Sequence, residues 1–350
     1  MAVEQPSRCL ECEGSSPSPS TALAPASEGI DRRGFLKTAA IAAGGLILGP
    51  SALHASPRAS AAVRAFKAAK PSADNAVARL FKSLKDDQRK QICFSFEDKL
   101  RSRISANWQI TPVKIESLTA EQQKIVGEIV KGVTSPEGYE RMLKQMDEDD
   151  GGMDNYAIAI FGNPEEGKCH FELTGRHVTL RADADGADST AFGGPIVYGH
   201  GAGDGQKGLP GNVYYYQTQE ANKVFTALDG KQRESALLEK APAEAAVKIQ
   251  GAKGTFSGIK VGDLSSDQKG LVESVIKTIL APYREDDVNE AMSILKDAGG
   301  LDDLRMAFYK SDNLGMDAEW DIWRIEGPSF VTHFRGAPHV HAYINIAKKA

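Results

Sequence analysis

Four segments of the chain share the pattern Leu-x-x-x-Gln, and their spacing constrains the fold more than any other feature of the sequence. They begin at Leu84, Leu118, Leu228 and Leu264. The first two are 34 residues apart and the last two 36, whereas the first and third are separated by 144 residues and the second and fourth by 146. A solenoid would repeat at one short period, so this paired spacing predicts a tandem duplication of one long unit.

The second and fourth of these segments both begin as a helix does. Thr119 and Ser265 carry hydroxyls that can cap a first turn, and Gln122 and Gln268 follow three residues later as in a capping box. Over the 14 residues from each leucine, 4 are identical. The chemistry of helix starts accounts for part of this likeness, so support for a repeat must also come from the sequence that follows.

That sequence is alike in the two halves. A second helical pattern comes first, at 136–146 and 286–296. Strand-like runs come next, at 156–161, 171–175 and 178–180 in one half and at 304–309, 323–327, 330–334 and 340–346 in the other. Strands grouped after helices are typical of an α+β fold rather than of alternating βαβ units.

We therefore predict an α+β fold made of tandem-duplicated halves, each with helices followed by an antiparallel β meander. The halves span about 74–200 and 212–348, and they are pseudo-symmetric parts of one domain. The glycine-rich stretch 193–211 is interpreted as the loop that joins them, with His200 on that loop.

The N-terminus resembles a twin-arginine export signal. Arg32-Arg33 and Phe35-Leu36-Lys37 precede an apolar run at 38–49 that is too short for a spanning helix of roughly 20 residues. Ala59-Ser60-Ala61 matches a cleavage site. We expect 1–61 to be a signal peptide with a disordered N-terminus, 62–350 to be the mature single domain, and the twin-arginine machinery to be a partner. The alternative is a short buried apolar helix.

These features predict a protein exported to the periplasm or another extracytoplasmic compartment, with no permanent membrane anchor. The predicted signal includes Cys9 and Cys12, so Cys93 and Cys169 remain as either one disulfide or two buried thiols. The net charge is -5, and Lys and Arg form no long cluster. A nucleic-acid-binding role is therefore disfavoured.

Six short motifs extend over most of the predicted mature chain: Trp108-x-x-x-Pro112, Ile160-Phe-Gly-x-Pro164, Gly175-Arg-His177, Gln219-Glu220, Trp323-Arg-Ile-Glu-Gly-Pro-Ser329 and His339-Val-His341. On these motifs, residues from about 75 to 346 resemble a bacterial family known only as domain of unknown function 3500. The resemblance implies that one fold extends over this region, and it implies no established reaction.

Histidines are the residues on which chemistry is most readily placed. His339 and His341 would share one face of a strand, and imidazole is a ligand suited to zinc, copper or iron. A turn at 335–338 would bring His333 close to them, and His177, near the matching glycine of the first half, could be the fourth ligand. Ser329 stands opposite His177 in the other half, so one metal ion per chain is expected.

The preferred hypothesis is a mononuclear histidine-ligated metalloenzyme, hydrolytic or redox, acting on a small molecule or a polymer. Arg176 and Arg335 are the candidate catalytic residues, because either could hold an anionic group beside the metal. The alternatives are a non-catalytic periplasmic protein that binds a metal or another ligand, a site that uses the same residues without metal, and structural histidines. The acidic stretch 147–150 is interpreted as a solvated helix end.

Overall fold

The computed structural model describes residues 73–183, 190–201, 211–313 and 319–348. The predicted export signal at 1–61 lies outside these residues, so export stays a prediction. Within the described ranges, no helix combines the length and the apolar character needed to cross a membrane.

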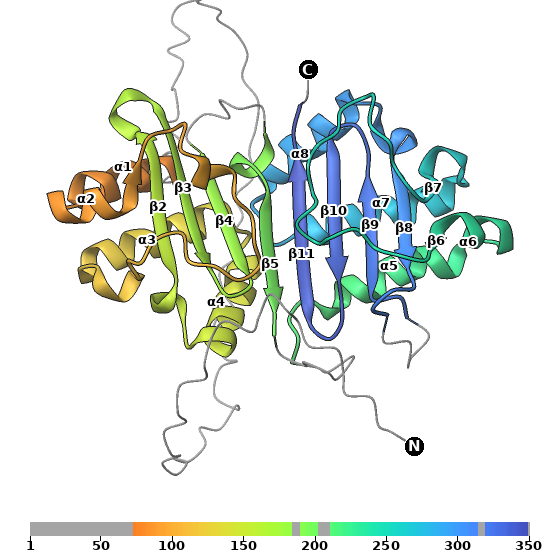
Figure 1. Ribbon diagram of the computed structural model, residues 1–350, viewed down its shortest axis with the longest axis horizontal. Helices are drawn as coiled ribbons and strands as arrows, with labels where there is room; N and C mark the ends of the chain where they lie inside the picture. The colour runs from red at the N-terminus through yellow and green to blue at the C-terminus, as the bar shows by residue number, and fades with distance from the viewer. Residues whose placement is uncertain (1–72, 184–189, 202–210, 314–318, 349–350) are drawn as a thin grey trace, which may run out of the picture. The chain divides into compact units, whose positions relative to one another are not determined.

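The described strands form one mixed sheet of eleven strands, with helices packed on one face (Figure 1). The first half contributes β1 (Cys93–Phe94), β2 (Ala157–Asn163), β3 (Lys168–Gly175), β4 (Val178–Asp183) and β5 (Ile196–His200). The second contributes β6 (Leu237–Leu238), β7 (Ile259–Lys260), β8 (Arg305–Tyr309), β9 (Ile322–Glu326), β10 (Phe330–Arg335) and β11 (Val340–Ile346). This mixture of segregated helices and strands is consistent with the predicted α+β class.

The helices also come in two sets. Those of the first half are α1 (Ala73–Ser83), α2 (Asp86–Ile92), α3 (Ala120–Val133) and α4 (Pro136–Asp150). Those of the second are α5 (Tyr215–Ala227), α6 (Gly230–Ala236), α7 (Ser266–Leu280) and α8 (Glu285–Asp297). The predicted caps are present at α3 and α7, where the hydroxyls of Thr119 and Ser265 accept from the backbone N–H groups of Gln122 and Gln268.

The strand order is β1-β2-β3-β4-β5-β11-β10-β9-β8-β6, which reads the same way from either edge. At each edge a two-residue strand, β1 or β6, pairs in parallel with its neighbour, β2 or β8. That neighbour is the first strand of a four-stranded antiparallel meander, β2–β5 in the first half and β8–β11 in the second. The two meanders meet where β5 pairs antiparallel with β11, with Ile196 opposite Ile344. The structure thus contains the predicted meanders, while duplication as their origin stays a prediction.

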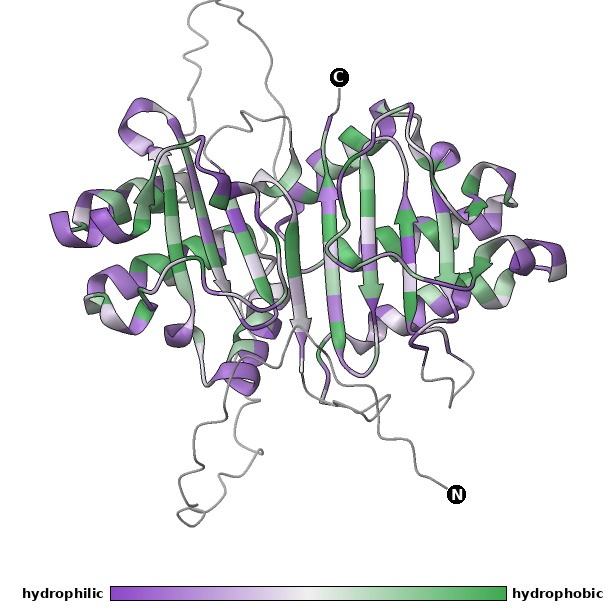
Figure 2. Cartoon of the chain, viewed as in Figure 1, coloured by the Kyte–Doolittle hydropathy of each residue, from purple (hydrophilic) through white to green (hydrophobic). Residues whose placement is uncertain are grey.

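Successive side chains along a strand point to opposite faces of the sheet, which gives the sheet an apolar face towards the helices and a more polar face on the other side. On β10, Phe330 and Phe334 pack into the helix-side core with Val275 and Ile279 of α7, whereas His333 and Arg335 belong to the other face. Figure 2 shows the same division, with hydrophobic residues concentrated on the strands and on the helix surfaces that meet them.

Two long connecting segments, 95–117 and 239–258, cover the face of the sheet opposite the helices (Figure 1). In the first half, Trp108 and Ile110 pack on β2, and the Trp108 indole N–H donates to Oγ1 of Thr179 over 2.9 Å. In the second half, Val247 and Ile249 pack with Tyr343. The histidines of β10 and β11 therefore lie beneath a cover of chain.

The prediction of a single loop over 193–211 is wrong in its first part, because β5 lies within it. Flanking glycines suggest a loop, yet Ile196 and Tyr198 pack on the helix side while Val197 packs on the other face. His200 ends this strand and is buried, with its Nδ1 accepting from the Val213 N–H over 3.0 Å. Cys93 and Cys169 form no disulfide with each other, and they lie on β1 and β3 with β2 between them.

Candidate metal centre

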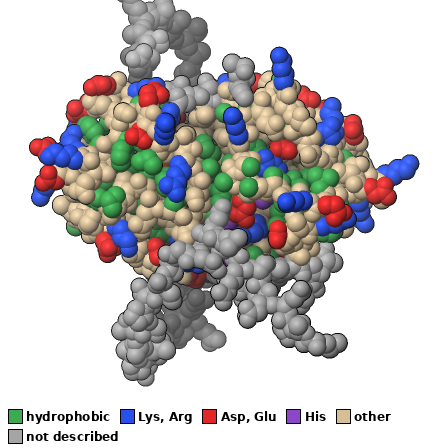
Figure 3. Space-filling model, viewed as in Figure 1, with side chains coloured by type: hydrophobic (Ala, Val, Ile, Leu, Met, Phe, Trp, Pro, Cys, Tyr) green, Lys and Arg blue, Asp and Glu red, His purple; other side chains and the backbone are tan. Residues whose placement is uncertain are grey.

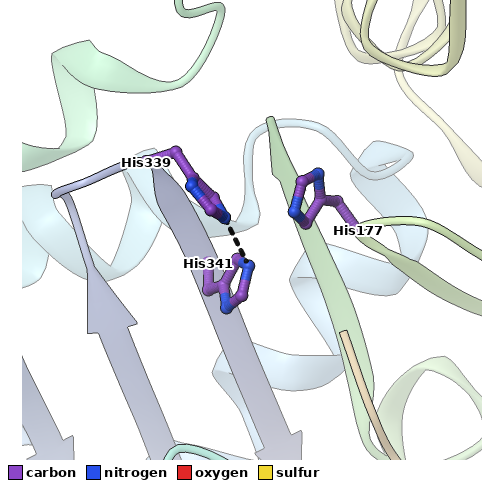
Figure 4. Close-up of side chains that lie close together, drawn as sticks. All are labelled: His177, His339 and His341. Atoms are coloured by element: carbon purple, nitrogen blue, oxygen red, sulfur yellow. Dashed lines mark hydrogen bonds between the residues drawn. The ribbon is translucent and has the colours of Figure 1, made fainter. Parts of the chain in front are cut away.

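Three histidine rings converge where the two halves of the sheet meet. One ring nitrogen from each of His177, His339 and His341 lies within 4.8 Å of the others, and all three residues are buried. Figure 4 shows the rings facing one another, His177 from the turn between β3 and β4, His339 just before β11 and His341 on it. The Nε2 atoms of His339 and His341 are 3.1 Å apart.

The backbone conformation at His177 places its ring beside the β5–β11 pair. His177 has a φ of 59°, which is unusual for a residue other than glycine, and its N–H donates to the carbonyl of Ala106. Gly199 pairs with His341 and has no side chain to occupy this face. A Cβ at Gly199 would lie 3.3 Å from the Cβ of His177, so the glycine makes room for the ring.

Carboxylates hold two of the three rings. The Nδ1 of His177 is 2.7 Å from Oδ2 of Asp149, and the Nδ1 of His341 is 2.7 Å from Oε2 of Glu244. A carboxylate only accepts hydrogen bonds, so each of these imidazoles carries its proton on Nδ1. The Nε2 lone pairs are thereby left for an ion, the arrangement typical of histidine ligands to metals.

The charges around His177 favour a neutral ring beside an ionised carboxylate. Burial lowers the pKa of His177 below its ordinary value, although the hydrogen bond to Asp149 opposes this effect. Burial raises the pKa of Asp149, but hydrogen bonds from His177, Gln145 and the Gly201 N–H outweigh it and hold that pKa below its ordinary value. A neutral imidazole is the form that binds a metal.

Asp149 contradicts the interpretation of 147–150 as a solvated helix end. Only 3% of its side chain is exposed, and it accepts from Gln145 Nε2 over 2.8 Å and from the Gly201 N–H over 2.8 Å. In the sequence, the feature that points to this role of Asp149 is its spacing of one helical turn from Gln145, which allows the two side chains to hydrogen-bond. Glu244 lies in the connecting segment 239–258, where no periodic pattern marks it.

Arg335 adds a positive charge to the cluster. Its Nη2 lies 3.2 Å from Nε2 of His339, and 2.9 and 3.0 Å from Nδ1 and Nε2 of His341. Its Nε forms an ion pair with Oε1 of Glu244 at 3.2 Å. Arg176 is placed differently: its carbonyl accepts from the hydroxyl of Tyr156 over 2.8 Å, and its charge lowers the pKa of His177.

His333, the remaining candidate ligand, lies outside the converging group. It is buried on β10 opposite Tyr343 of β11, whereas Arg335 is the residue opposite His341. Its ring lies 6.4 Å from that of Tyr309, and burial lowers its pKa to about 4. The structure thus brings together three of the four histidines selected from the sequence.

The cluster is close to the molecular surface despite its burial. His339 is 2% exposed, and the side chain of Glu244 is 19% exposed. Figure 3 shows a small area of histidine atoms near the middle of the face that carries the connecting segments, next to acidic side chains.

The fold and the site define an α+β protein with a buried triple-histidine cluster that could hold a metal ion. The model of the family described as Protein of unknown function (DUF3500) matches residues 67–346, and the chain belongs to that family. Comparison with the curated proteins and with the solved structures gives no significant match.

Proposed function

We propose that this protein binds one transition-metal ion through the Nε2 atoms of His177, His339 and His341, as the reactive centre of an extracytoplasmic enzyme. The observation that carries the proposal is the pair of carboxylate–histidine contacts, Asp149 to His177 and Glu244 to His341. A ring that needed only a structural hydrogen bond would not require its second nitrogen to face two other imidazoles.

The number of ligands favours catalysis over storage. Three protein ligands leave at least one coordination position for water or substrate, whereas sites that only hold a metal usually surround it with four protein ligands. Imidazole ligands suit zinc, copper and iron. The bound ion would supply either an activated water for hydrolysis or a redox centre.

Metal content tests the proposal directly. The full chain, purified without chelators, should contain one equivalent of a transition metal by elemental analysis. The variant His339→Ala, His341→Ala should lose it while keeping the circular dichroism spectrum of the wild type. His333→Ala should retain the metal, because His333 lies outside the converging group. Equal metal content in the wild type and the double variant would refute these ligands, and this comparison also accounts for any ion held by Cys9 and Cys12.

We further propose export through the twin-arginine route, on the strength of Arg32-Arg33 and the apolar run that follows them. In the native host, replacing both arginines with lysine should abolish processing and retain the protein in the cytoplasm. Normal processing of that variant would exclude this route.

We infer that the two halves arose by tandem duplication. Support comes from the strand register. Cys93 of β1 is opposite Ile160 of β2, and Leu237 of β6 is opposite Phe308 of β8. Leu237 follows Cys93 by 144 residues and Phe308 follows Ile160 by 148, so the second pair repeats the first at nearly the same offset. An experimental structure should superpose α2, α3 and β2–β4 on α6, α7 and β8–β10. A poor fit of these elements would leave the Leu-x-x-x-Gln pattern as a helix-start feature only.

A further inference from the structure

The position of Arg335 bears on which molecules the histidine cluster accepts. Arg335 of β10 is paired with His341 of β11, so its side chain lies on the same face as that ring. Its guanidinium contacts His339 and His341 together, and its side chain is only 10% exposed. Glu244 contacts both Arg335 and His341, which fixes the arginine relative to the ring.

In this arrangement the guanidinium lies next to the ring nitrogens that a metal ion would need as ligands. An arginine is always charged and only donates hydrogen bonds, so Nη2 can bond only to unprotonated ring nitrogens. Nε2 of His341, at 3.0 Å, meets this condition, because Glu244 holds the proton of that ring on Nδ1. A bound metal would take this lone pair and place a second positive charge next to Arg335.

A negatively charged group between the two cations removes this conflict. A carboxylate can accept two hydrogen bonds from a planar guanidinium, and its oxygens are also metal ligands. Glu244 cannot serve in this way while one of its oxygens accepts from His341 and the other pairs with Nε of Arg335. A carboxylate of a bound ligand would fill this role.

We propose that a small carboxylate binds between Arg335 and the metal ion, so that the carboxylate and the metal bind cooperatively. The inference rests on the proposed metal site, and it names the chemical class of the ligand that this site takes. Coupling between two ligands is reciprocal, so the anion strengthens metal binding by the same factor as the metal strengthens anion binding.

Cobalt(II) is a suitable probe, because its visible absorption reports coordination geometry as well as binding. The full chain would be titrated with cobalt(II) in the presence of 100 mM acetate, chloride or sulfate at equal ionic strength. Acetate should increase cobalt affinity about tenfold over chloride, within the range usual for coupled sites, and should change the absorption spectrum. Sulfate, which is tetrahedral, should have less than half of that effect.

Variants of Arg335 identify the group responsible. In Arg335→Gln, cobalt should bind more tightly in chloride than it does in the wild type, and acetate should change the affinity by less than about twofold. Arg335→Lys keeps the charge but lacks the planar fork, so its acetate effect should be intermediate. Arg305→Gln is the matched control, because Arg305 lies on β8 and donates to the Gly258 carbonyl; it should behave as the wild type.

The outcomes separate this inference from the metal site itself. If cobalt binds the wild type and the His339→Ala, His341→Ala variant equally, the proposed metal site is wrong. If cobalt binding depends on these histidines but is insensitive to acetate, or stays sensitive to acetate in Arg335→Gln, the carboxylate proposal is wrong and the metal site stands. A sulfate effect larger than that of acetate would overturn the assignment to carboxylates.

Discussion

Gln88 and Gln122 exchange two side-chain hydrogen bonds, with Nε2 of Gln88 donating over 2.9 Å and Nε2 of Gln122 donating back over 3.1 Å. Gln232 and Gln268 form the same reciprocal pair in the second half, over 3.2 and 2.8 Å. Each glutamine also accepts a backbone N–H at the start of its own helix. In each half, the Leu-x-x-x-Gln pattern therefore marks two helix starts that lie side by side and are joined by their glutamine side chains.

Removing one glutamine of a pair should destabilise the fold. Gln122 is 2% exposed and also donates to the carbonyl of Ser83, so Gln122→Ala should lower the free energy of unfolding by about 2 kcal/mol. In that background, Gln88→Ala should cost at least about 0.5 kcal/mol less than it does alone. Urea unfolding measures both effects. Exposed Gln91→Ala is the control, and strictly additive losses would argue against the pair.

The carboxylates that hold the histidines should control metal affinity. Asp149→Asn and Glu244→Gln should each weaken metal binding by about 10- to 100-fold, because the ring loses the partner that fixes its proton and orientation. Asp147→Asn, on the exposed side of α4, is the matched control and should bind as the wild type. Competition with a chelator of known affinity provides the measurement, and unchanged affinity in both variants would remove the basis of the proposed centre.

A side chain at Gly199 should disrupt the junction of the two halves. A Cβ there would lie 2.2 Å from the carbonyl oxygen of Val340, a backbone atom that can move only with β11. Gly199→Ala should therefore lower the free energy of unfolding by about 1–3 kcal/mol and reduce metal binding. Gly230→Ala is the control, since no atom beyond its chain neighbours and its own helix backbone lies within 4 Å of its Cβ position. Equal stability of the two variants would contradict this packing.

His333 should make the fold sensitive to acid. Burial lowers its pKa to about 4, below the 6.5 of a free histidine. The unfolded chain therefore binds more protons between these values, so stability falls as the pH is lowered from 6.5 towards 4. With a chelator present, the wild type should lose about 2 kcal/mol more than His333→Gln between pH 7.5 and pH 4.5. Equal losses in urea unfolding would mean that the ring is protonated in the fold.

Features that depend on local sequence could be predicted, and those that depend on strand register could not. The helix starts at Thr119 and Ser265 and the hairpin between β10 and β11 follow from short patterns. The position of β5 does not follow from the sequence, because glycine and proline surround its short apolar run. His333 is near His339 and His341 in sequence, but the hairpin register places Arg335, and not His333, opposite His341.

The site shows the same limit. The convergence of His339 and His341 could be expected from their spacing along a strand, whereas Asp149 and Glu244 reach the cluster from a helix end and from a connecting segment. No spacing rule links those two carboxylates to the histidines, because the contacts exist only once both halves of the sheet are paired. Sequence patterns identify ligands more readily than the residues that orient them.

The pairing of β5 with β11 also determines when an ion can be captured during synthesis. His177 and His341 are 164 positions apart, and β11 is the last strand along the chain in the described sheet. A ribosome must therefore have made both halves, and β11 must have joined the sheet beside β5, before the three rings face one another. An ion bound there would be acquired only after the two halves have paired, and it would connect β11 to a turn that was synthesised much earlier.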